Sequence, residues 1–292
     1  MSLLENIVPS SRDGRELHDD IFDELRAFVY QRTGIYFRDN KQYLLESQVG
    51  RRLKALDLNT FEDYLDLLRN GHAKDELPHL FNAVTINETS FFRHPKQYEA
   101  VIQTVLPELL EGQTGRPHVR LWSAACSTGD EPYTLALLIH DRLAPRFPDA
   151  RFDIVGSDIN TDVFDEARSG RYSAHAVRNV PASYLRSYFT QEGDTYTLHR
   201  KIRRMVTFYN LNLVDQDAMA RLRPFDLIFC ANVLIYFDET TKQQVVGDLY
   251  KALRPGGFLF VGTSETLHNV TRAFRPVRFD DAIGYKKLDS HA

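Results

Sequence analysis

The sequence predicts a helical N-terminal domain followed by an α/β domain built on a mainly parallel sheet. Two observations lead to this fold class. The first ~85 residues place apolar side chains at helical spacing and show no strand-like alternation. Beyond about residue 118, short apolar runs alternate with amphipathic stretches, which is typical of a parallel sheet covered by helices on both faces. A chain of 292 residues is long enough to hold both domains.

The helical domain is expected over residues 15–86, and its helices follow from their apolar faces. One face contains Leu17, Ile21, Leu25, Phe28 and Val29, and a second contains Tyr43, Leu44, Leu45, Val49, Leu53 and Leu56. Thr60 is a suitable N-cap for a third helix, because Asp63 follows it at the third position. Residues 87–117 then connect this domain to the sheet and carry part of the candidate site.

The α/β domain is expected over residues 118–292. Its strands are predicted at 118–123, 152–157, 225–231 and 258–262, and its helices at 132–143, 161–168 and 239–253. The alternation lapses between Gly170 and Asn210, where residues 195–198 and 205–208 resemble short strands near a turn at 192–194. We therefore expect a small antiparallel β subdomain, residues 171–209, inserted in the larger domain.

Composition argues against several classes of protein. The net charge of −4 disfavours a nucleic-acid partner, because phosphate binding usually shows as a basic excess. No apolar run approaches the roughly 20 residues that cross a bilayer, and the N-terminus does not resemble a secretory signal. The two cysteines lie in apolar segments and the ten histidines lack metal-ligand spacing. We expect a cytoplasmic protein without a disulfide framework or a bound metal.

The run Leu121–Pro132 combines a strand, a turn of small residues and the start of a helix. A doubly wound sheet binds nucleotide-like ligands at such a place, although most turns of this kind only connect two elements. Asp130 and Glu131 directly follow Gly129, the single glycine of the turn. Two carboxylates would repel a pyrophosphate and suit S-adenosylmethionine, which carries a positive sulfonium and ammonium. Acidic residues also favour helix N-termini for dipole reasons alone.

Three further segments carry candidate site residues. Asp158 ends the second predicted strand, where a carboxylate binds ribose hydroxyls or caps the next helix, and the preceding turn favours the ribose role. Asn232 and Tyr236 fall at the edge of the sheet where doubly wound enzymes keep their sites, although Tyr236 alone is more simply a core aromatic. The run Asn87–Arg93 mixes polar and aromatic residues, and on general grounds it indicates only a joint between domains.

These segments, in this order, resemble the chemotaxis receptor glutamate O-methyltransferase (CheR) family. The resemblance extends from about Leu17 to about Lys287. It rests on Asn-Glu-Thr-Ser-Phe-Phe-Arg from Asn87, Ser-Thr-Gly-Asp-Glu-Pro-Tyr from Ser127, Ser-Asp-Ile-Asn from Ser157 and Asn-Val-Leu-Ile-Tyr-Phe from Asn232. The resemblance implies a Rossmann-like class I methyltransferase domain with an inserted small antiparallel β subdomain, preceded by an all-α N-terminal domain.

The resemblance also implies an activity and a set of site residues. The family transfers a methyl group from S-adenosylmethionine to glutamate carboxylates of methyl-accepting chemotaxis receptors, giving methyl esters and S-adenosylhomocysteine for sensory adaptation. The residues that match its cofactor contacts are Asn87, Thr89, Arg93, Glu131, Asp158, Asn212, Leu213, Ala231 and Asn232. The chain departs from the family pattern at Ala231, where an arginine is common.

Methyl transfer to a carboxylate depends mostly on alignment, because the carboxylate is already a nucleophile and the sulfonium already has a good leaving group. We expect Arg93 and Tyr236 to border the methyl group and to orient the glutamate, with no metal and no covalent intermediate. One alternative is a nucleic-acid methyltransferase, but the prolines of an Asn-Pro-Pro-Tyr-like motif are missing after Asn232. Another is a non-catalytic receptor adaptor, and the intact Glu131, Asp158 and Asn232 weigh against it.

Two expectations concern the receptor, whose cytoplasmic domain is the expected partner. The candidate docking residues lie on or near the second helix and are Lys41, Arg51, Arg52 and Lys54; by spacing alone they form a solvated helix face. In part of the family the β subdomain captures a peptide at the receptor's C-terminus by strand pairing. The corresponding loop here is short, and Glu192 and Asp194 would repel an acidic peptide. We therefore expect no such tether.

Overall fold

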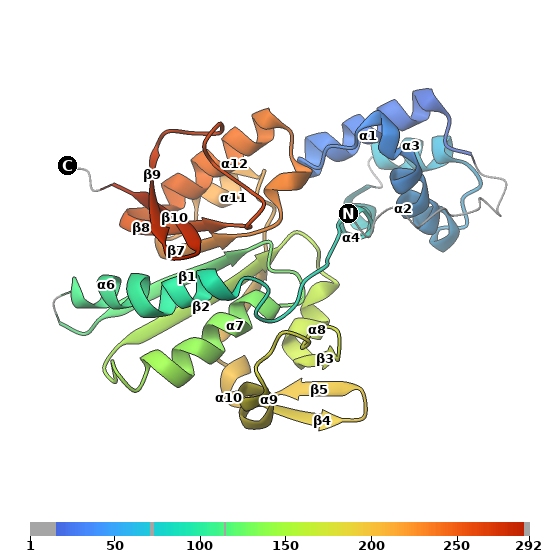
Figure 1. Ribbon diagram of the computed structural model, residues 1–292. Coiled ribbons are helices and arrows are strands. Elements are labelled where there is room, and N and C mark those ends of the chain that lie inside the picture. The colour runs from blue at the N-terminus through green and yellow to red at the C-terminus, as the bar shows by residue number, and fades with distance from the viewer. Residues whose placement is uncertain (1–15, 71–72, 114, 289–292) are drawn as a thin grey trace. The chain divides into compact units, whose positions relative to one another are not determined.

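The computed structural model describes residues 16–70, 73–113 and 115–288 of the chain (Figure 1). The chain divides into two compact units, with the division between Ile86 and Asn87. The N-terminal unit is helical and has a hydrophobic core of its own, while the second unit is built around a large sheet. Each unit therefore has the internal packing of a domain.

The N-terminal unit is built from α1 (Asp19–Thr33), the 3-10 turn η2 (Asp39–Lys41), α2 (Gln42–Ala55), α3 (Phe61–Arg69) and α4 (Ala73–Val84). The apolar faces predicted from the sequence form its core, with Leu25, Val49 and Tyr64 fully buried. Thr60 caps α3 as predicted, since its hydroxyl accepts the Asp63 N–H at 3.1 Å. Helix α4 is an addition to the prediction, and Pro78 lies inside it.

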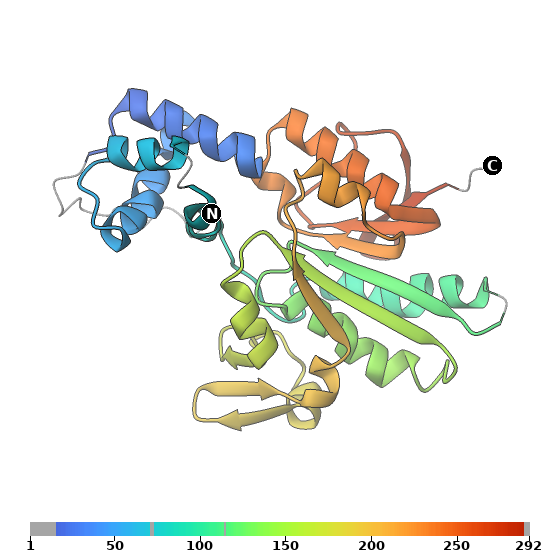
Figure 2. The ribbon, with the colours of Figure 1, turned by 180° about the vertical axis from the view of Figure 1, so that it is seen from behind.

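The second unit contains a seven-stranded sheet with the order β6-β2-β1-β7-β8-β10-β9 (Figure 2). Its strands are β1 (His118–Ala124), β2 (Arg151–Asp158), β6 (Val206–Asn210), β7 (Phe225–Cys230), β8 (Leu253–Val261), β9 (Phe274–Phe279) and β10 (Ala282–Lys287). Neighbours run parallel from β6 to β8, and β10 is antiparallel to β8 and β9. The chain therefore reverses its direction of travel across the sheet between β1 and β7.

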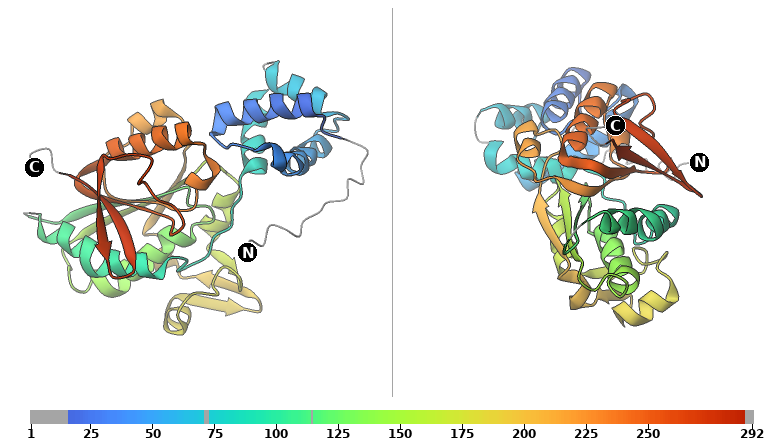
Figure 3. Two further views of the ribbon diagram at one scale, coloured as in Figure 1. Left: turned by 45° about the horizontal axis from the view of Figure 1, so that its top comes forward. Right: turned by 90° about the vertical axis from the view of Figure 1, so that its left-hand side faces the viewer.

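Helices cover both faces of this sheet (Figure 3). One hydrophobic cluster contains residues of α5 (Pro95–Ala100), η3 (Val101–Val105), α6 (Leu106–Glu111), α7 (Asp130–Leu138) and η4 (Ile139–Leu143). A second cluster contains residues of α11 (Gln216–Ala220) and α12 (Glu239–Ala252). On the face of this second cluster, the Trp122 indole N–H of β1 donates to Ser157 Oγ of β2 at 2.9 Å. A mainly parallel sheet covered by helices, the predicted fold class, is thus confirmed.

A small three-stranded antiparallel sheet follows α8 (Val163–Ser169), in the order β3-β5-β4. It consists of β3 (Arg171–Ser173), β4 (Phe189–Glu192) and β5 (Thr195–Leu198), accompanied by α9 (Ala182–Tyr188) and α10 (Arg200–Arg203). Figure 1 shows β4 and β5 as a projecting hairpin. Only Gly193, with φ 58°, and Asp194 separate these two strands. The predicted antiparallel insertion is present, and its turn is tight.

The third strand of the large sheet differs from its predicted place. Residues 205–208 are expected in the β subdomain, but β6 pairs in parallel with β2 from Val206↔Ile154 to Asn210↔Asp158. The inserted sheet therefore ends before Val206. Short apolar runs have the same pattern in either sheet, so the sequence alone does not separate the two assignments. Among the described helices, none is long and apolar enough to cross a membrane.

Candidate active site

The candidate site residues follow four neighbouring strands of the large sheet. Glu131 comes after β1, Asp158 ends β2, Asn212 comes after β6 and Asn232 comes after β7. The carboxyl ends of parallel strands meet at one edge, and ligands bind where the strand order reverses. That reversal lies between β1 and β7. The fold therefore brings residues that are far apart in sequence to one edge of the sheet.

The turn after β1 has an unusual backbone. Ala125 and Ser127 have φ values of 57° and 48°, in the left-handed region that residues with a side chain rarely enter. Gly129 has φ 87°, and a Cβ there would lie 2.9 Å from the ring of Phe208. Both the conformation and the close approach therefore require glycine at position 129. Strained backbone of this kind gathers at ligand sites.

Of the two acidic residues in this turn, Asp130 does not face a ligand. It is fully buried, and its Oδ2 accepts from Thr128 Oγ1 at 2.6 Å. Its Oδ1 has no hydrogen-bond partner within the described part of the chain. Burial raises the pKa of Asp130 to about 6. The expectation that two carboxylates line the ligand is therefore wrong for Asp130, because a helix start buries one side of the turn.

Glu131, the second acidic residue, is partly exposed. Its Oε1 accepts from Ser123 Oγ of β1 at 2.7 Å. Burial raises the pKa of Glu131 to about 7, whereas the positive charge of Arg93 opposes this rise. A poorly solvated carboxylate is stabilised in its charged form by a nearby cation. Glu131 is thus suited to a positively charged ligand.

Asp158 is turned into the protein. Its Oδ2 accepts the Ser127 N–H at 2.8 Å, its Oδ1 accepts the Asn160 N–H at 2.9 Å, and the residue is only 5% exposed. These bonds hold the strained turn against the end of β2, a role that the sequence does not predict. A carboxylate has about four acceptor positions, so the ribose contact stays a prediction beside this structural role.

The segment from Asn87 lies against the same turn. Ser127 Oγ donates to the Asn87 carbonyl at 3.1 Å. Phe92, with φ 55°, donates its N–H to Thr134 Oγ1 of α7 at 3.1 Å. These two hydrogen bonds hold both ends of the Asn87–Arg93 segment against the second unit. Without the family resemblance, the sequence of this segment indicates only a connection between domains.

Arg93 and Thr89 belong to that segment, and both are half-buried. The Arg93 guanidinium donates to the Glu88 carbonyl at 2.7 Å. Burial raises the pKa of both Glu131 and Tyr236, and the positive charge of Arg93 opposes this rise in each case. The charge of Arg93 therefore reaches Tyr236, and the role of both residues at the methyl group stays a prediction.

Asn232 follows β7 in a left-handed conformation, with φ 62°. Its N–H donates to Glu265 Oε2 at 2.8 Å, and its Oδ1 lies 2.8 Å from Nε2 of His94. Glu265 also accepts the N–H of Gly262 at 2.7 Å and of Ile235 at 3.2 Å. Glu265 thus joins the loop after β7 to the end of β8. The sequence predicts neither Glu265 nor His94, because only the strand order brings them to Asn232.

Tyr236 ends the 3-10 turn η5 (Leu234–Tyr236) and is half-buried. Burial raises the pKa of Tyr236, while Arg93 opposes the rise. The hydroxyl is therefore protonated at neutral pH and available as a donor. Ala231 is also half-buried, between β7 and Asn232, and it has no polar side chain for a ligand.

Asn212 and Leu213 follow β6. Asn212 is half-buried, and its Oδ1 accepts the Val214 N–H at 3.2 Å. Leu213 is buried in the hydrophobic cluster that also contains Trp122. The side chain of Leu213 therefore packs in the core. The predicted cofactor contact of Leu213 can then involve only its backbone.

The predicted docking residues belong to the N-terminal unit. Arg51 and Lys54 are exposed near the end of α2. Lys41 is half-buried, with its Nζ 3.3 Å from the hydroxyl of Tyr43. These three residues are accessible to a partner to different degrees, with Arg51 and Lys54 the most exposed.

Arg52 has a different role from its neighbours. Its Nε and Nη2 donate to the two carboxylate oxygens of Glu76 at 2.8 and 2.9 Å. Glu76 is buried, and its Oε1 also accepts from the Tyr64 hydroxyl at 2.8 Å. Arg52 therefore neutralises a buried carboxylate. The two guanidinium N–H groups that donate to Glu76 are not available to a partner protein.

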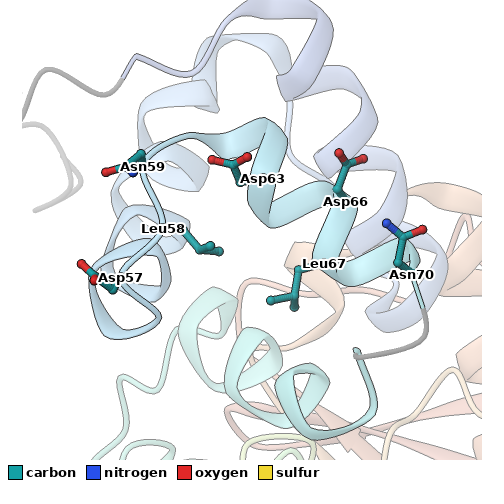
Figure 4. A pocket seen from close by; sticks show the side chains of 7 residues that line it. All are labelled: Asp57, Leu58, Asn59, Asp63, Asp66, Leu67 and Asn70. Atoms are coloured by element: carbon teal, nitrogen blue, oxygen red, sulfur yellow. The ribbon is translucent and has the colours of Figure 1, made fainter.

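A hollow of about 500 Å³ lies on the same unit, beside α3 (Figure 4). The residues that line it are Asp57, Leu58, Asn59, Asp63, Asp66, Leu67 and Asn70. Three of them are carboxylates, so this side of the unit would repel an acidic partner. The exposed arginine and lysine that are predicted for docking, Arg51 and Lys54, lie on α2.

The site in the second unit fits S-adenosylmethionine. The turn offers the poorly solvated carboxylate of Glu131 and no basic side chain, which suits a cationic ligand better than a phosphate. No group of three or more His, Cys, Asp or Glu side chains in the described ranges is placed to hold a metal ion. Together with the order of the strands, these features define a Rossmann-like, S-adenosylmethionine-dependent methyltransferase.

Comparison of the sequence with models of known protein families assigns the chain to a family. The family model described as "CheR methyltransferase, SAM binding domain" matches residues 87–283. The model described as "CheR methyltransferase, all-alpha domain" matches residues 20–85. The chain belongs to the CheR methyltransferase family.

Curated relatives agree with this assignment. "Chemotaxis protein methyltransferase 2" of Vibrio cholerae serotype O1 is 36% identical and covers 92% of this chain and 93% of that protein. "Chemotaxis protein methyltransferase" of Escherichia coli K12 is 34% identical over 88% of each chain. "Chemotaxis protein methyltransferase 1" of Pseudomonas aeruginosa is 32% identical over 91% of this chain and 97% of that protein.

Proposed function

We propose that this chain methylates glutamate side chains in the cytoplasmic domains of chemoreceptors, giving glutamate methyl esters and S-adenosylhomocysteine. The three relatives named above are chemotaxis protein methyltransferases, which supports a chemoreceptor substrate. The observation that favours a carboxylate as the acceptor is that the positive charge of Arg93 acts on Tyr236, which follows β7 at the edge of the sheet. A cation and a phenolic donor together suit an incoming carboxylate.

Arg93 is the residue best able to bind the substrate glutamate. A guanidinium has five N–H donors, and one of them goes to the Glu88 carbonyl. The others can hold a carboxylate in a fixed orientation, and the Tyr236 hydroxyl adds a further donor. S-adenosylmethionine, when bound, supplies an electrophilic methyl group on a sulfonium. The protein's main task is then alignment, since an ionised carboxylate needs no general base.

Asn87, Thr89, Glu131, Asp158, Asn212, Leu213, Ala231 and Asn232 are the proposed cofactor contacts. Glu131 would face a positive group of the cofactor. His94 keeps Asn232 in place: burial lowers the pKa of His94, so its neutral ring donates to Asn232 without adding charge beside the cofactor.

The test is transfer of a labelled methyl group to purified receptor cytoplasmic fragments. Glutamate methyl esters release labelled methanol in mild alkali, whereas N-methyl products do not. We expect alkali-labile label that disappears when the acceptor glutamates are replaced by alanine. Alkali-stable label, or label on RNA and none on receptor, would contradict the proposal.

We propose further that the receptor is bound through α2 without a peptide tether. Arg51 and Lys54 are exposed on α2 and complement an acidic receptor helix. The two-residue turn at Gly193 and Asp194 leaves no loop to open around a peptide, and the exposed Glu192 adds negative charge. Titration of the isolated receptor C-terminal peptide into the enzyme should give no heat of binding. Micromolar binding would show that the tether exists.

A further inference from the structure

The inserted β subdomain shares its core with the methyltransferase domain. Tyr172, Phe189 and Leu198 of its strands are buried in the hydrophobic cluster that also contains α7 and β1. The Tyr188 hydroxyl of α9 donates to Asp141 Oδ1 of η4 at 2.7 Å. The subdomain is therefore held against the large domain by packing as well as by hydrogen bonds.

Tyr172 of β3 connects the subdomain directly to the turn after β1. Its hydroxyl donates to the Thr128 carbonyl at 2.9 Å, and the residue is only 2% exposed. Thr128 lies between Ser127 and Gly129, whose φ values are 48° and 87°. The hydrogen bond thus ends at the centre of the strained turn.

Phe91 connects the other cofactor segment to the same subdomain. Its N–H donates to the Ala176 carbonyl at 3.0 Å. Its ring packs edge-to-face on Tyr172, with ring centroids 4.8 Å apart, and on Phe189 at 5.4 Å. Ser90 Oγ accepts from Asn179 Nδ2 at 3.3 Å. Both the Asn87–Arg93 segment and the turn after β1 are therefore anchored on the insertion.

We propose that Tyr172 is a positioning residue: through its bond to Thr128, the inserted subdomain helps to set the affinity for the methyl donor. This inference rests on the proposed placement of S-adenosylmethionine at that turn. A left-handed backbone persists only when its surroundings over-determine it. Asp158 holds the turn through the Ser127 N–H, the Asn87 carbonyl holds it through Ser127 Oγ, and Tyr172 holds it from the subdomain.

The test compares two tyrosine hydroxyls of the same subdomain. Tyr172→Phe removes the bond to the turn and keeps the ring, whereas Tyr188→Phe removes a bond of the same partly buried kind to Asp141 that does not reach the turn. Calorimetry with S-adenosylmethionine, without receptor, should show binding about five- to tenfold weaker for Tyr172→Phe, the effect of losing one hydrogen bond. Tyr188→Phe should stay within about twofold of the wild type, a change that corresponds to less than half a kcal/mol.

A steady-state readout separates positioning from simple loss of stability. For Tyr172→Phe, the KM for S-adenosylmethionine should rise more than kcat falls, and the KM for receptor should stay unchanged. Equal weakening by both variants, or wild-type affinity in Tyr172→Phe, would overturn the inference. Because binding is measured without receptor, either result is independent of whether glutamate is the acceptor.

Hydrogen exchange on the wild-type protein gives a second test that needs no variant. Addition of S-adenosylmethionine should slow amide exchange in β3 and β5, which pair at Tyr172↔Tyr196, because the ligand stabilises the turn to which Tyr172 is bonded. An unchanged exchange rate in both strands at saturating cofactor would contradict the coupling.

Discussion

Nε2 of His94 lies 2.8 Å from Oδ1 of Asn232, although 138 positions separate the two residues. Burial lowers the pKa of His94 from its ordinary 6.5. The unfolded chain therefore takes up this proton at a higher pH than the folded protein does. The stabilising contribution is present above about pH 6.5 and is lost as the pH falls through the folded value.

The substitution His94→Gln should make unfolding less dependent on pH. Glutamine can still donate to Asn232 but does not titrate, so thermal stability should fall less between pH 7.5 and 5.5 than in the wild type. The exposed His268, replaced by glutamine, serves as the matched control. Identical pH profiles for wild type and His94→Gln would show that His94 does not contribute this dependence.

Glu131 should couple cofactor binding to proton release. Its pKa of about 7 means that the carboxyl is partly protonated at neutral pH, while a cationic ligand favours the charged form. Affinity for S-adenosylmethionine should therefore rise with pH through about 7, with protons released in calorimetry. Glu131→Gln should bind about tenfold more weakly and lose this dependence. A pH-independent wild type would argue against the assignment.

The same substitution should have the opposite effect on the stability of the ligand-free protein. A carboxyl pKa raised from 4.5 to about 7 favours folding at low pH, and this contribution is lost as the pH rises through 7. At pH 8, Glu131→Gln should therefore melt at a higher temperature than the wild type, since the glutamine carries no buried charge. A lower melting temperature at pH 8 would indicate that Glu131 is well solvated without ligand.

Asp158→Ala should weaken S-adenosylmethionine binding by at least ~1.4 kcal/mol, a tenfold change. The loss has two sources, the Ser127 N–H that anchors the turn and the predicted ribose contact. A thermodynamic cycle that combines Asp158→Ala with a cofactor analogue lacking the 2′-hydroxyl separates these two sources of lost affinity. Non-additive losses indicate a direct ribose contact, whereas strictly additive losses leave only the structural role. Unchanged affinity in Asp158→Ala would contradict both.

Arg51→Glu combined with Lys54→Glu should abolish receptor methylation and leave cofactor affinity intact. Both residues are exposed on α2, so the effect is electrostatic and should weaken as salt rises. Arg52→Met is the contrasting variant: it should destabilise the N-terminal unit by about 3 kcal/mol, because Glu76 stays buried without its cation. Normal methylation by the double variant at low salt would place the docking surface elsewhere.

Arg93→Ala and Tyr236→Phe should each lower turnover about tenfold or more, while changing the melting temperature little. Arg93→Ala should also weaken cofactor binding, since its charge acts on Glu131. Tyr209→Phe is a suitable control, because its buried hydroxyl has no hydrogen-bond partner among the residues that the structure describes. Full turnover in Arg93→Ala and Tyr236→Phe at saturating substrates would rule out their proposed roles.

Local signals in the sequence predict most of the elements but not the cross-connections. Thr60 is identifiable as a cap because the bond it makes spans three residues, and Asp158 is identifiable as a strand end. Glu265 cannot be identified as a site residue from the sequence, because its partner Asn232 lies 33 positions away. The two residues meet only because β7 and β8 are neighbours in the sheet. For the same reason the sequence does not show that Asp130 is buried while Glu131 is partly exposed.

The hairpin β4–β5 has one end in the core and one end in solvent. Phe189 and Leu198 are buried, whereas a side chain added at Gly193 would meet no neighbouring atom within 4 Å. Insertions at such a turn have a small entropic cost and leave the packed end untouched. During evolution, a family member could therefore lengthen this turn into a peptide-binding loop, or shorten it again, while its methyl-donor turn stays anchored. Recognition of new receptors can diversify there without new selection on the chemistry.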